Sequence, residues 1–365
     1  MKKKDIVYLR GLNGIRAIAA VGVLLSHINL SLTKYKVESF SLFETNRGWT
    51  LGEQGVTMFF VLSGFLITYL LILEKNKTGS IDKNNFYRRR ILRIFPLYYL
   101  YLSIALLTVY LTTSELRAGG GIISLYILLL ANIPFIIEKA IPACDHLWSI
   151  AVEEQFYLFW PFVFKQNINF RKILFASIII SVLIRVLLWK FFPFKIFTIF
   201  FTVNRFDCMM FGGLIAVLYI DKSQFMNIIN HKASKLFAYL VILIHIVNYE
   251  IVNSIVSMEL VTLATGIIIC DQISNTKPIV NFENRIMNFL GKYSYGIYIY
   301  HPLYIYLLAK LHLFDLIKDD NLRGISIFIT ITTITIFTAY CSYEFFENRF
   351  IMLKNRFSEI HTTNN

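Results

Sequence analysis

The chain has 365 residues, of which 56% are hydrophobic and only 16% are charged, and its formal net charge is +13. Soluble domains carry about 25% charged and about 45 to 50% apolar residues, so this composition excludes an ordinary soluble enzyme and a disordered chain. Lys and Arg gather at the ends of apolar runs, where orientation in a membrane accounts for them, so the basic charge does not indicate a nucleic-acid partner. The composition predicts a protein that spans a lipid bilayer several times.

Apolar runs of the order of 20 residues, the length that crosses the hydrocarbon core, recur along the chain. They are 15–33, 56–73, 91–111, 122–137, 147–164, 173–192, 206–220, 236–252, 256–273, 286–311 and 325–346. The fourth is short and ends in breakers around Pro134, so we expect it to enter the membrane and return, which keeps the basic loops and both termini in the cytoplasm. The sequence predicts one all-α domain over 1–365, with a core over 8–350, about ten transmembrane helices, a candidate re-entrant segment and a short polar C-terminal tail.

Two ionisable residues lie within the first run, Arg16 near its start and His27 deep inside. A charged side chain at mid-membrane costs about 2.5 to 3.5 kcal/mol, so such residues are functional candidates by default. Their spacing of eleven residues places both on one face of a helix, roughly 16 Å apart along its axis. The alternative is a neutral buried histidine bonded to a carbonyl group, with an arginine that only orients the helix.

Arginines cluster where the third run begins, at positions 88, 89, 90 and 93. Arg90 and Arg93 are i,i+3 neighbours and Arg89 and Arg93 are i,i+4 neighbours, so their guanidinium groups project from one side of a helix. A fork of arginine donors at the inner surface suits a phosphate-bearing cytosolic ligand. The alternative is a basic cluster that faces lipid headgroups, although Arg93 lies inside the apolar run.

The fifth run opens with a set of polar side chains, namely His146, Ser149, Glu153, Glu154 and Tyr157. A spacing of seven brings His146 and Glu153 onto one face of a helix, and Glu154 lines up with Tyr157. A carboxylate buried in a membrane helix needs a partner or a proton. These residues are candidates for a site, because a purely structural role leaves two carboxylates unexplained.

Polar residues also open the run 206–220, where Arg205 precedes Asp207. Residues two apart do not face each other on a helix, so we expect each of them to pair with a different neighbour, and Arg205 is a candidate pocket residue. The glycines at 212–213 are interpreted as a point of close helix packing rather than as part of a ligand site.

Tyr298 and His301 are i,i+3 neighbours in the tenth run and are further candidate pocket residues. The alternative is an aromatic belt residue beside an interfacial histidine. No metal site is predicted, because the four cysteines are far apart and form no C-x-x-C pair.

The order of these motifs resembles the acyltransferase-3 family of polytopic membrane acyltransferases. The matching segments are Tyr8 to Ala20 followed by His27, Gly55 to Ile67, Phe86 to Pro96 with Arg90-x-x-Arg93, His146 to Tyr157, and Ser294 to Pro302. The resemblance covers about residues 8 to 350. One departure is Asn13, where the family commonly has an aspartate, so any role of that charge is absent here or is supplied by another residue.

The resemblance implies a multi-pass enzyme of a bacterial cytoplasmic membrane. It would move a short acyl group, with acetyl favoured, from cytosolic acyl-CoA to a hydroxyl of an extracytoplasmic saccharide. His27, paired with Arg16, would act as general base or acyl carrier, and Glu153 or Glu154 would orient its ring or take its proton. Arg89, Arg90 and Arg93 would bind the phosphates of the donor. The saccharide acceptor would contact outer loops such as residues 34–54.

A transporter or flippase for a glycan or an anion is the competing interpretation, in which the same buried His, Arg and Glu residues form a proton relay or an anion path. The sequence has no inverted repeat and no matched pair of Gly/Pro-broken helices, and its basic residues concentrate at one surface. These features favour the enzyme.

Overall fold

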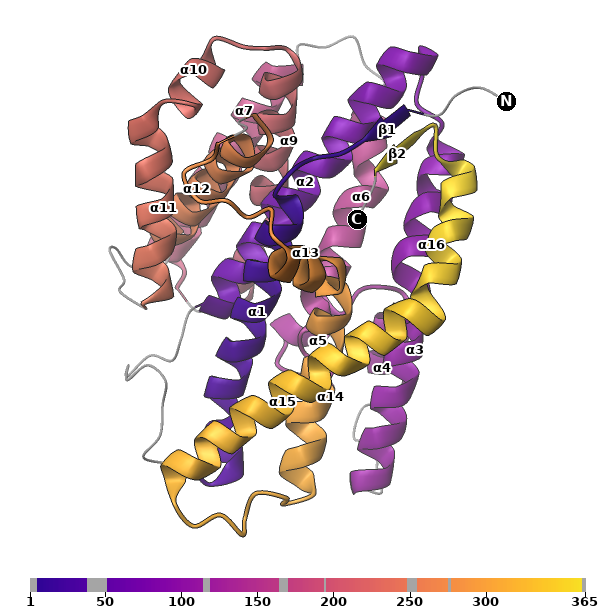
Figure 1. Ribbon diagram of the computed structural model, residues 1–365, viewed down its shortest axis with the longest axis vertical. Helices are drawn as coiled ribbons and strands as arrows, with labels where there is room; N and C mark the ends of the chain where they lie inside the picture. Colours follow the sequence, from indigo (N-terminus) through magenta and orange to yellow (C-terminus); the bar gives the residue numbers. More distant parts are fainter. Residues whose placement is uncertain are drawn as a thin grey trace.

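The computed structural model of the chain describes residues 5–37, 51–113, 119–163, 170–193, 195–247, 255–274 and 277–362. These form a bundle of helices, as the sequence predicts, with two very short strands (Figure 1). The elements are β1 (Asp5–Val7), α1 (Leu12–Ser31), η1 (Leu32–Tyr35), α2 (Leu51–Thr78), α3 (Lys83–Thr113), α4 (Gly120–Ile127), α5 (Asn132–Ile136), α6 (Leu147–Val163), α7 (Phe170–Phe191), α8 (Ile196–Val203), α9 (Phe206–Ile220), α10 (Phe225–Ile229), α11 (Lys232–Ile246), α12 (Ile255–Ser274), α13 (Arg285–Lys292), α14 (Ser294–Lys310), α15 (Asp320–Ser342), η2 (Tyr343–Glu347), α16 (Asn348–Lys354), η3 (Asn355–Phe357) and β2 (Ile360–Thr362).

Within the described ranges, seven helical stretches are long and apolar enough to cross a membrane. They are Leu12–Tyr35, Leu51–Thr78, Lys83–Thr113, Phe170–Phe191, Ile196–Ile220, Val256–Ser274 and Asp320–Phe357. Three more helices, α6, α11 and α14, have 17, 15 and 17 residues, so the count of about ten crossings stays a prediction. The predicted run 122–137 coincides with most of α4 and with all of α5, which have 8 and 5 residues. At 1.5 Å per residue, neither helix is long enough to cross the bilayer.

The two ends of the described chain meet at one end of the bundle. β1 and β2 pair in parallel, with Asp5 opposite Ile360 and Val7 opposite Thr362, and Figure 1 shows both strands close to α16. The start of α3 lies at the same end, because the guanidinium of Arg89 donates to the carbonyl of Phe357 at 2.9 Å. The arginine cluster and both termini therefore share one side, and the assignment of that side to the cytoplasm stays a prediction.

The approach to α1 is anchored by Glu283. Its carboxylate accepts hydrogen bonds from the backbone N–H of Gly11 at 2.7 Å and from the hydroxyl of Tyr8. Partial burial opposes ionisation, but the hydrogen bonds from Tyr8, Asn288 and Gly11 prevail and lower the pKa of Glu283. Gly11 has a φ of 73°, a left-handed conformation that favours glycine, so the turn that aims α1 depends on this residue.

Helices α2 and α9 cross in direct backbone contact. A Cβ atom on Gly64 would lie 1.9 Å from the carbonyl oxygen of Met209, and one on Gly212 would lie 1.9 Å from that of Val61. Only hydrogen fits at either position, so Gly212 has the packing role that the sequence suggests. The crossing holds α2 close to the core and fixes the position of Ser63, the neighbour of Gly64.

We predict that Gly212→Ala destabilises the protein. Overpacking costs about 1 to 3 kcal/mol, which outweighs the gain of about 1 kcal/mol from replacing a helical glycine by alanine. Gly121→Ala in α4 is the matched control, because its added Cβ meets no atom within 4 Å. Thermal unfolding in detergent measures both variants, and equal midpoints for the two would contradict the tight crossing.

Candidate active site

A cavity of about 190 Å³ extends between α1, α2, α3, α6 and α14, and its lining includes Val7 of β1 and Lys354 of α16. We call it the central cavity. Its walls include apolar side chains from α1, α2 and α3 and a few polar groups from helices far apart in the sequence. The polar and charged lining residues are Tyr8, Asn13, Arg16, Ser63, Arg90, Arg93, Ser149, Glu153, Tyr157, Ser294, Tyr295, Tyr298 and Lys354.

Four half-buried cations line this cavity, namely Arg16 of α1, Arg90 and Arg93 of α3, and Lys354 of α16. We call them the cation cluster. Across the described parts of the chain, none of the four forms a salt bridge with a carboxylate. Like charges held together with restricted access to water repel one another, so a polyanion bound among them would be strongly favoured.

Neutral groups hold two members of the cation cluster in place. Arg16 donates to the side-chain oxygen of Asn13 at 3.1 Å, and the guanidinium of Arg90 lies 4.3 Å from the centre of the Tyr157 ring. At Asn13, where the family commonly has an aspartate, an amide therefore orients Arg16 without neutralising it. This leaves the positive charge of Arg16 available to the cavity.

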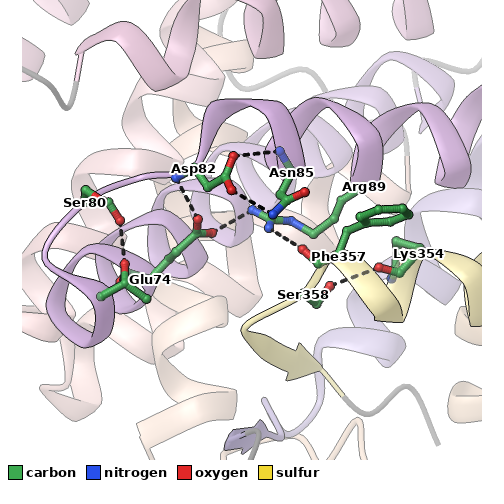
Figure 2. Close-up of polar contacts among 9 residues, drawn as sticks. Glu74, Ser80, Asp82, Asn85, Arg89, Lys354, Phe357 and Ser358 are labelled. Carbon is green, nitrogen blue, oxygen red and sulfur yellow. Dashed lines mark hydrogen bonds and ion pairs between the residues drawn. The ribbon is translucent and has the colours of Figure 1, made fainter. Parts of the chain in front are cut away.

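Arg89 has a different environment from Arg90 and Arg93. Its guanidinium forms a salt bridge with Glu74 of α2 at 2.7 Å and donates to the carbonyl of Phe357, and Figure 2 shows it enclosed between α2, α3 and the C-terminal segment. Glu74 also accepts from the backbone N–H of Asp82 at 3.0 Å. Arg89 therefore joins the last segment of the chain to the bundle, and of the arginines on α3 only Arg90 and Arg93 line the central cavity.

Lys354 was not expected from the sequence. It follows the last apolar run, where a lysine is typical of a solvated tail, and only the folded chain brings it among three arginines. Its position depends on the pairing of β1 with β2 and on the Arg89 contact with Phe357, both of which hold the C-terminal segment against the cavity.

Glu153 lines the central cavity, and its carboxylate accepts hydrogen bonds from the hydroxyls of Ser63 and Tyr157. Ser63 lies in one of the segments that resemble the family, but the sequence does not predict it as a site residue, because no sequence spacing relates α2 to α6. Glu154 is turned about 100° from Glu153 on α6, and Arg90 is the cation that interacts with it electrostatically.

The inner end of the cavity is formed by Ser149 and Tyr298, whose hydroxyls lie 2.5 Å apart. The hydroxyl of Tyr298 also lies 3.0 Å from the carbonyl oxygen of His146, to which it donates. The ring of Tyr298 packs at 5.6 Å from the ring of His146 and at 5.8 Å from that of His301. The cavity thus ends one side chain away from buried imidazoles.

Three histidines meet behind Tyr298, and we call His27, His146 and His301 the histidine cluster. Nδ1 of His27 lies 2.8 Å from Nε2 of His301, and the ring of His146 lies 5.5 Å from that of His301. His146 is 2% exposed and His301 is fully buried. His301 is the side chain that contacts Nδ1 of His27, while Glu153 is bonded to Ser63 and Tyr157. That Glu153 or Glu154 orients the ring of His27 or takes its proton stays a prediction.

Arg205 lies outside both the lining of the central cavity and the histidine cluster. It donates to the hydroxyl of Thr57 at 2.6 Å, while Asp207 forms a salt bridge with Arg185 at 2.8 Å. Each residue of the pair thus has its own neighbour, as expected. Of the outer loop 34–54 that was suggested to contact the acceptor, residues 38–50 lie outside the described residues.

Comparison with known proteins places these motifs in a family. The acyltransferase-3 family, described as an acyltransferase domain, matches residues 9–344. Two relatives from Staphylococcus aureus, "Putative O-acetyltransferase SACOL0978" of strain COL and "Putative O-acetyltransferase SAS0844" of strain MSSA476, are each 29% identical over 380 residues, which cover 96% of this chain and 58% of the relative. "O-acetyltransferase OatA" of strain NCTC 8325 is 34% identical over 165 residues, or 43% of this chain and 24% of the relative.

The chain therefore spans less than two thirds of the length of these curated relatives. No solved structure matches it significantly.

We predict that Glu74→Ala lowers the free energy of unfolding by about 3 kcal/mol, because it leaves the charge of Arg89 without its partner in a largely buried position. Arg89→Ala removes the other partner. The double variant should lose less free energy of unfolding than the two single variants lose together. Asp221→Ala, which breaks the exposed pair with Arg171, is the control and should cost at most about 1 kcal/mol. Strictly additive losses in Glu74 and Arg89 would rule out a direct interaction between them.

Proposed function

The chain belongs to the acyltransferase-3 family, and on that premise we propose that it transfers a short acyl group, with acetyl favoured, from cytosolic acyl-CoA to a hydroxyl of an extracytoplasmic glycan. One observation carries the proposal. The central cavity leads from the cation cluster to Tyr298, whose ring contacts the histidine cluster. The cation cluster and the buried imidazoles are thus connected through the interior of the bundle, which supports a donor site at one end and a base at the other.

The cation cluster suits the donor by its charge. Acyl-CoA carries three phosphate groups, and arginine binds phosphate through two parallel hydrogen bonds while lysine contributes a point charge. Arg90, Arg93 and Lys354 line the cavity together with Arg16 of α1. Phosphates bound there would leave the pantetheine arm free to enter the cavity.

The distance between the two clusters suits the length of that arm. Arg16 and His27 are separated by eleven residues of one helix, which corresponds to roughly 16 Å along its axis. An extended phosphopantetheine arm is of comparable length. It would pass Ser63 and Glu153, which offer hydrogen-bonding groups to its amides, and would present the thioester near the histidine cluster.

His27 is the reactive base in this proposal. Its ring removes the proton of an acceptor hydroxyl while the oxygen attacks the thioester carbon, the C–S bond breaks, and the departing thiolate receives the proton. A two-step route uses the same groups, with the ring nitrogen as the first nucleophile and the hydroxyl oxygen attacking the acyl-imidazole. Both routes need a histidine that reaches the donor from the cavity side and the acceptor from the outer side.

The test of this proposal measures transfer of labelled acetyl from acetyl-CoA to envelope glycans in membranes that contain the protein. We expect an alkali-labile product, as an O-ester should be, and His27→Ala should lower kcat by at least about 10²-fold, since positioned acid–base catalysis contributes that much or more. His312→Asn is the control, because His312 is exposed at a φ of 52°, which asparagine tolerates. Full activity of His27→Ala would refute its role, and glycan or anion uptake without acetyl transfer would favour a transporter.

A second prediction concerns Lys354. Replacing it by methionine keeps much of its length and removes one charge-assisted contact, which is worth about 1.5 to 3 kcal/mol, so the Kd for CoA should rise about ten- to hundredfold. Lys172→Met on the exposed face of α7 is the matched control and should leave the Kd unchanged. Calorimetric titration with CoA measures both, and an unchanged Kd in Lys354→Met would remove Lys354 from the donor site.

A further inference from the structure

We propose that His301 is a positioning residue that fixes the proton of His27 on Nδ1 and leaves Nε2 of His27 as the reactive nitrogen. The inference rests on the proposed function for its catalytic meaning, but its structural content can be tested separately. It follows from the hydrogen-bonding partners of the two rings, which lie 274 positions apart in the sequence.

The hydrogen of the neutral His301 ring lies on Nδ1. Its Nδ1 lies 3.2 Å from the carbonyl oxygen of Ile297, one turn earlier on α14. A carbonyl oxygen only accepts hydrogen bonds, so this nitrogen carries hydrogen. The carbonyl of Ile297 therefore keeps Nδ1 of His301 protonated.

A single hydrogen is shared in the bond between the rings of His27 and His301. Nδ1 of His27 and Nε2 of His301 are 2.8 Å apart, so only one of them carries hydrogen in that bond. If it were Nε2, His301 would hold two protons and place a full charge at a fully buried position, which is costly. His301 therefore accepts and His27 donates from Nδ1, so a neutral His27 has its lone pair on Nε2.

The consequence for the reaction is the same on either proposed route. When Nε2 of His27 takes the proton of the acceptor hydroxyl, the imidazolium that forms keeps its Nδ1–H directed at an acceptor. When Nε2 instead attacks the thioester, a C–N bond forms, the C–S bond breaks and the thiolate leaves, while the Nδ1 hydrogen bond persists. His301 thus keeps the reactive nitrogen available and stabilises the positive charge that develops on His27.

His146 is not the orienting ring. Neither of its nitrogens has a partner of good hydrogen-bond geometry among the described residues, and its ring packs edge-on against Tyr101. The ring of His301 is held from several sides, because Tyr298 and His146 pack against it, and α14 approaches α15 closely where Gly296 faces Ala339. A rigid setting of this kind is what a positioning residue requires.

The tautomer can be read directly by nitrogen NMR of the full protein, labelled with [15N]histidine and reconstituted in nanodiscs, with His27 assigned by its loss in His27→Gln. We expect a protonated Nδ1 and an unprotonated Nε2 on His27, and a shift toward the Nε2–H form in His301→Leu. A protonated Nε2 in the wild-type protein would overturn the inference, whether or not the protein transfers acetyl groups.

Kinetics supply the second readout. His301→Leu removes the acceptor and should lower kcat by about 10²- to 10⁴-fold, while the KM for acetyl-CoA should change less than about threefold. His301→Gln keeps an acceptor oxygen, so its kcat should be at least about tenfold higher than that of His301→Leu. His312→Asn should match the wild-type rate.

If the wild-type protein transfers acetyl and folded His301→Leu retains its kcat, the inference fails while the proposed function stands. If the wild-type protein transfers none, the proposed function fails and the NMR result decides the tautomer alone.

Discussion

Polar groups buried between helices need partners from within the protein, because a hydrocarbon surrounding offers none. The structure meets this requirement at Arg89 with Glu74 and at Arg185 with Asp207. The cation cluster departs from it, since its four positive charges converge on one cavity without a salt bridge among the described residues. Like charges that share one cavity repel one another, and a bound anion would relieve that repulsion. The constraint that explains the structural pairs therefore also supports the donor site that we propose at the cation cluster.

The helices and one face of α1 could be predicted from the sequence, because length, hydropathy and a period of 3.6 residues are local properties. Arg16 and His27 do lie along one helix, with Arg16 at the central cavity and His27 in the histidine cluster. The partners could not be predicted in the same way. His301 contacts His27, and Ser63 contacts Glu153, across separations that no spacing rule covers.

Neighbouring arginines show a second limit of sequence reasoning. Arg89 and Arg90 are successive residues about 100° apart on α3, so a single motif supplies one residue to a salt bridge with Glu74 and the other to the central cavity. Lys354 shows the converse, because a residue with the sequence context of a solvated tail becomes part of the site once the C-terminal segment pairs with β1. Tertiary contacts, rather than helical periodicity, decide which basic residues face the cavity.

The proposed route places the donor phosphates at the end of the bundle that holds the termini and the reactive histidine roughly 16 Å further along α1. The most direct test uses proteoliposomes with a single orientation, established by protease access to the C-terminal tail, and a saccharide acceptor on the face opposite the tail. We predict that labelled acetyl reaches the acceptor only when acetyl-CoA is supplied on the face that carries the tail. Equal transfer with acetyl-CoA supplied only on the opposite face would contradict the account.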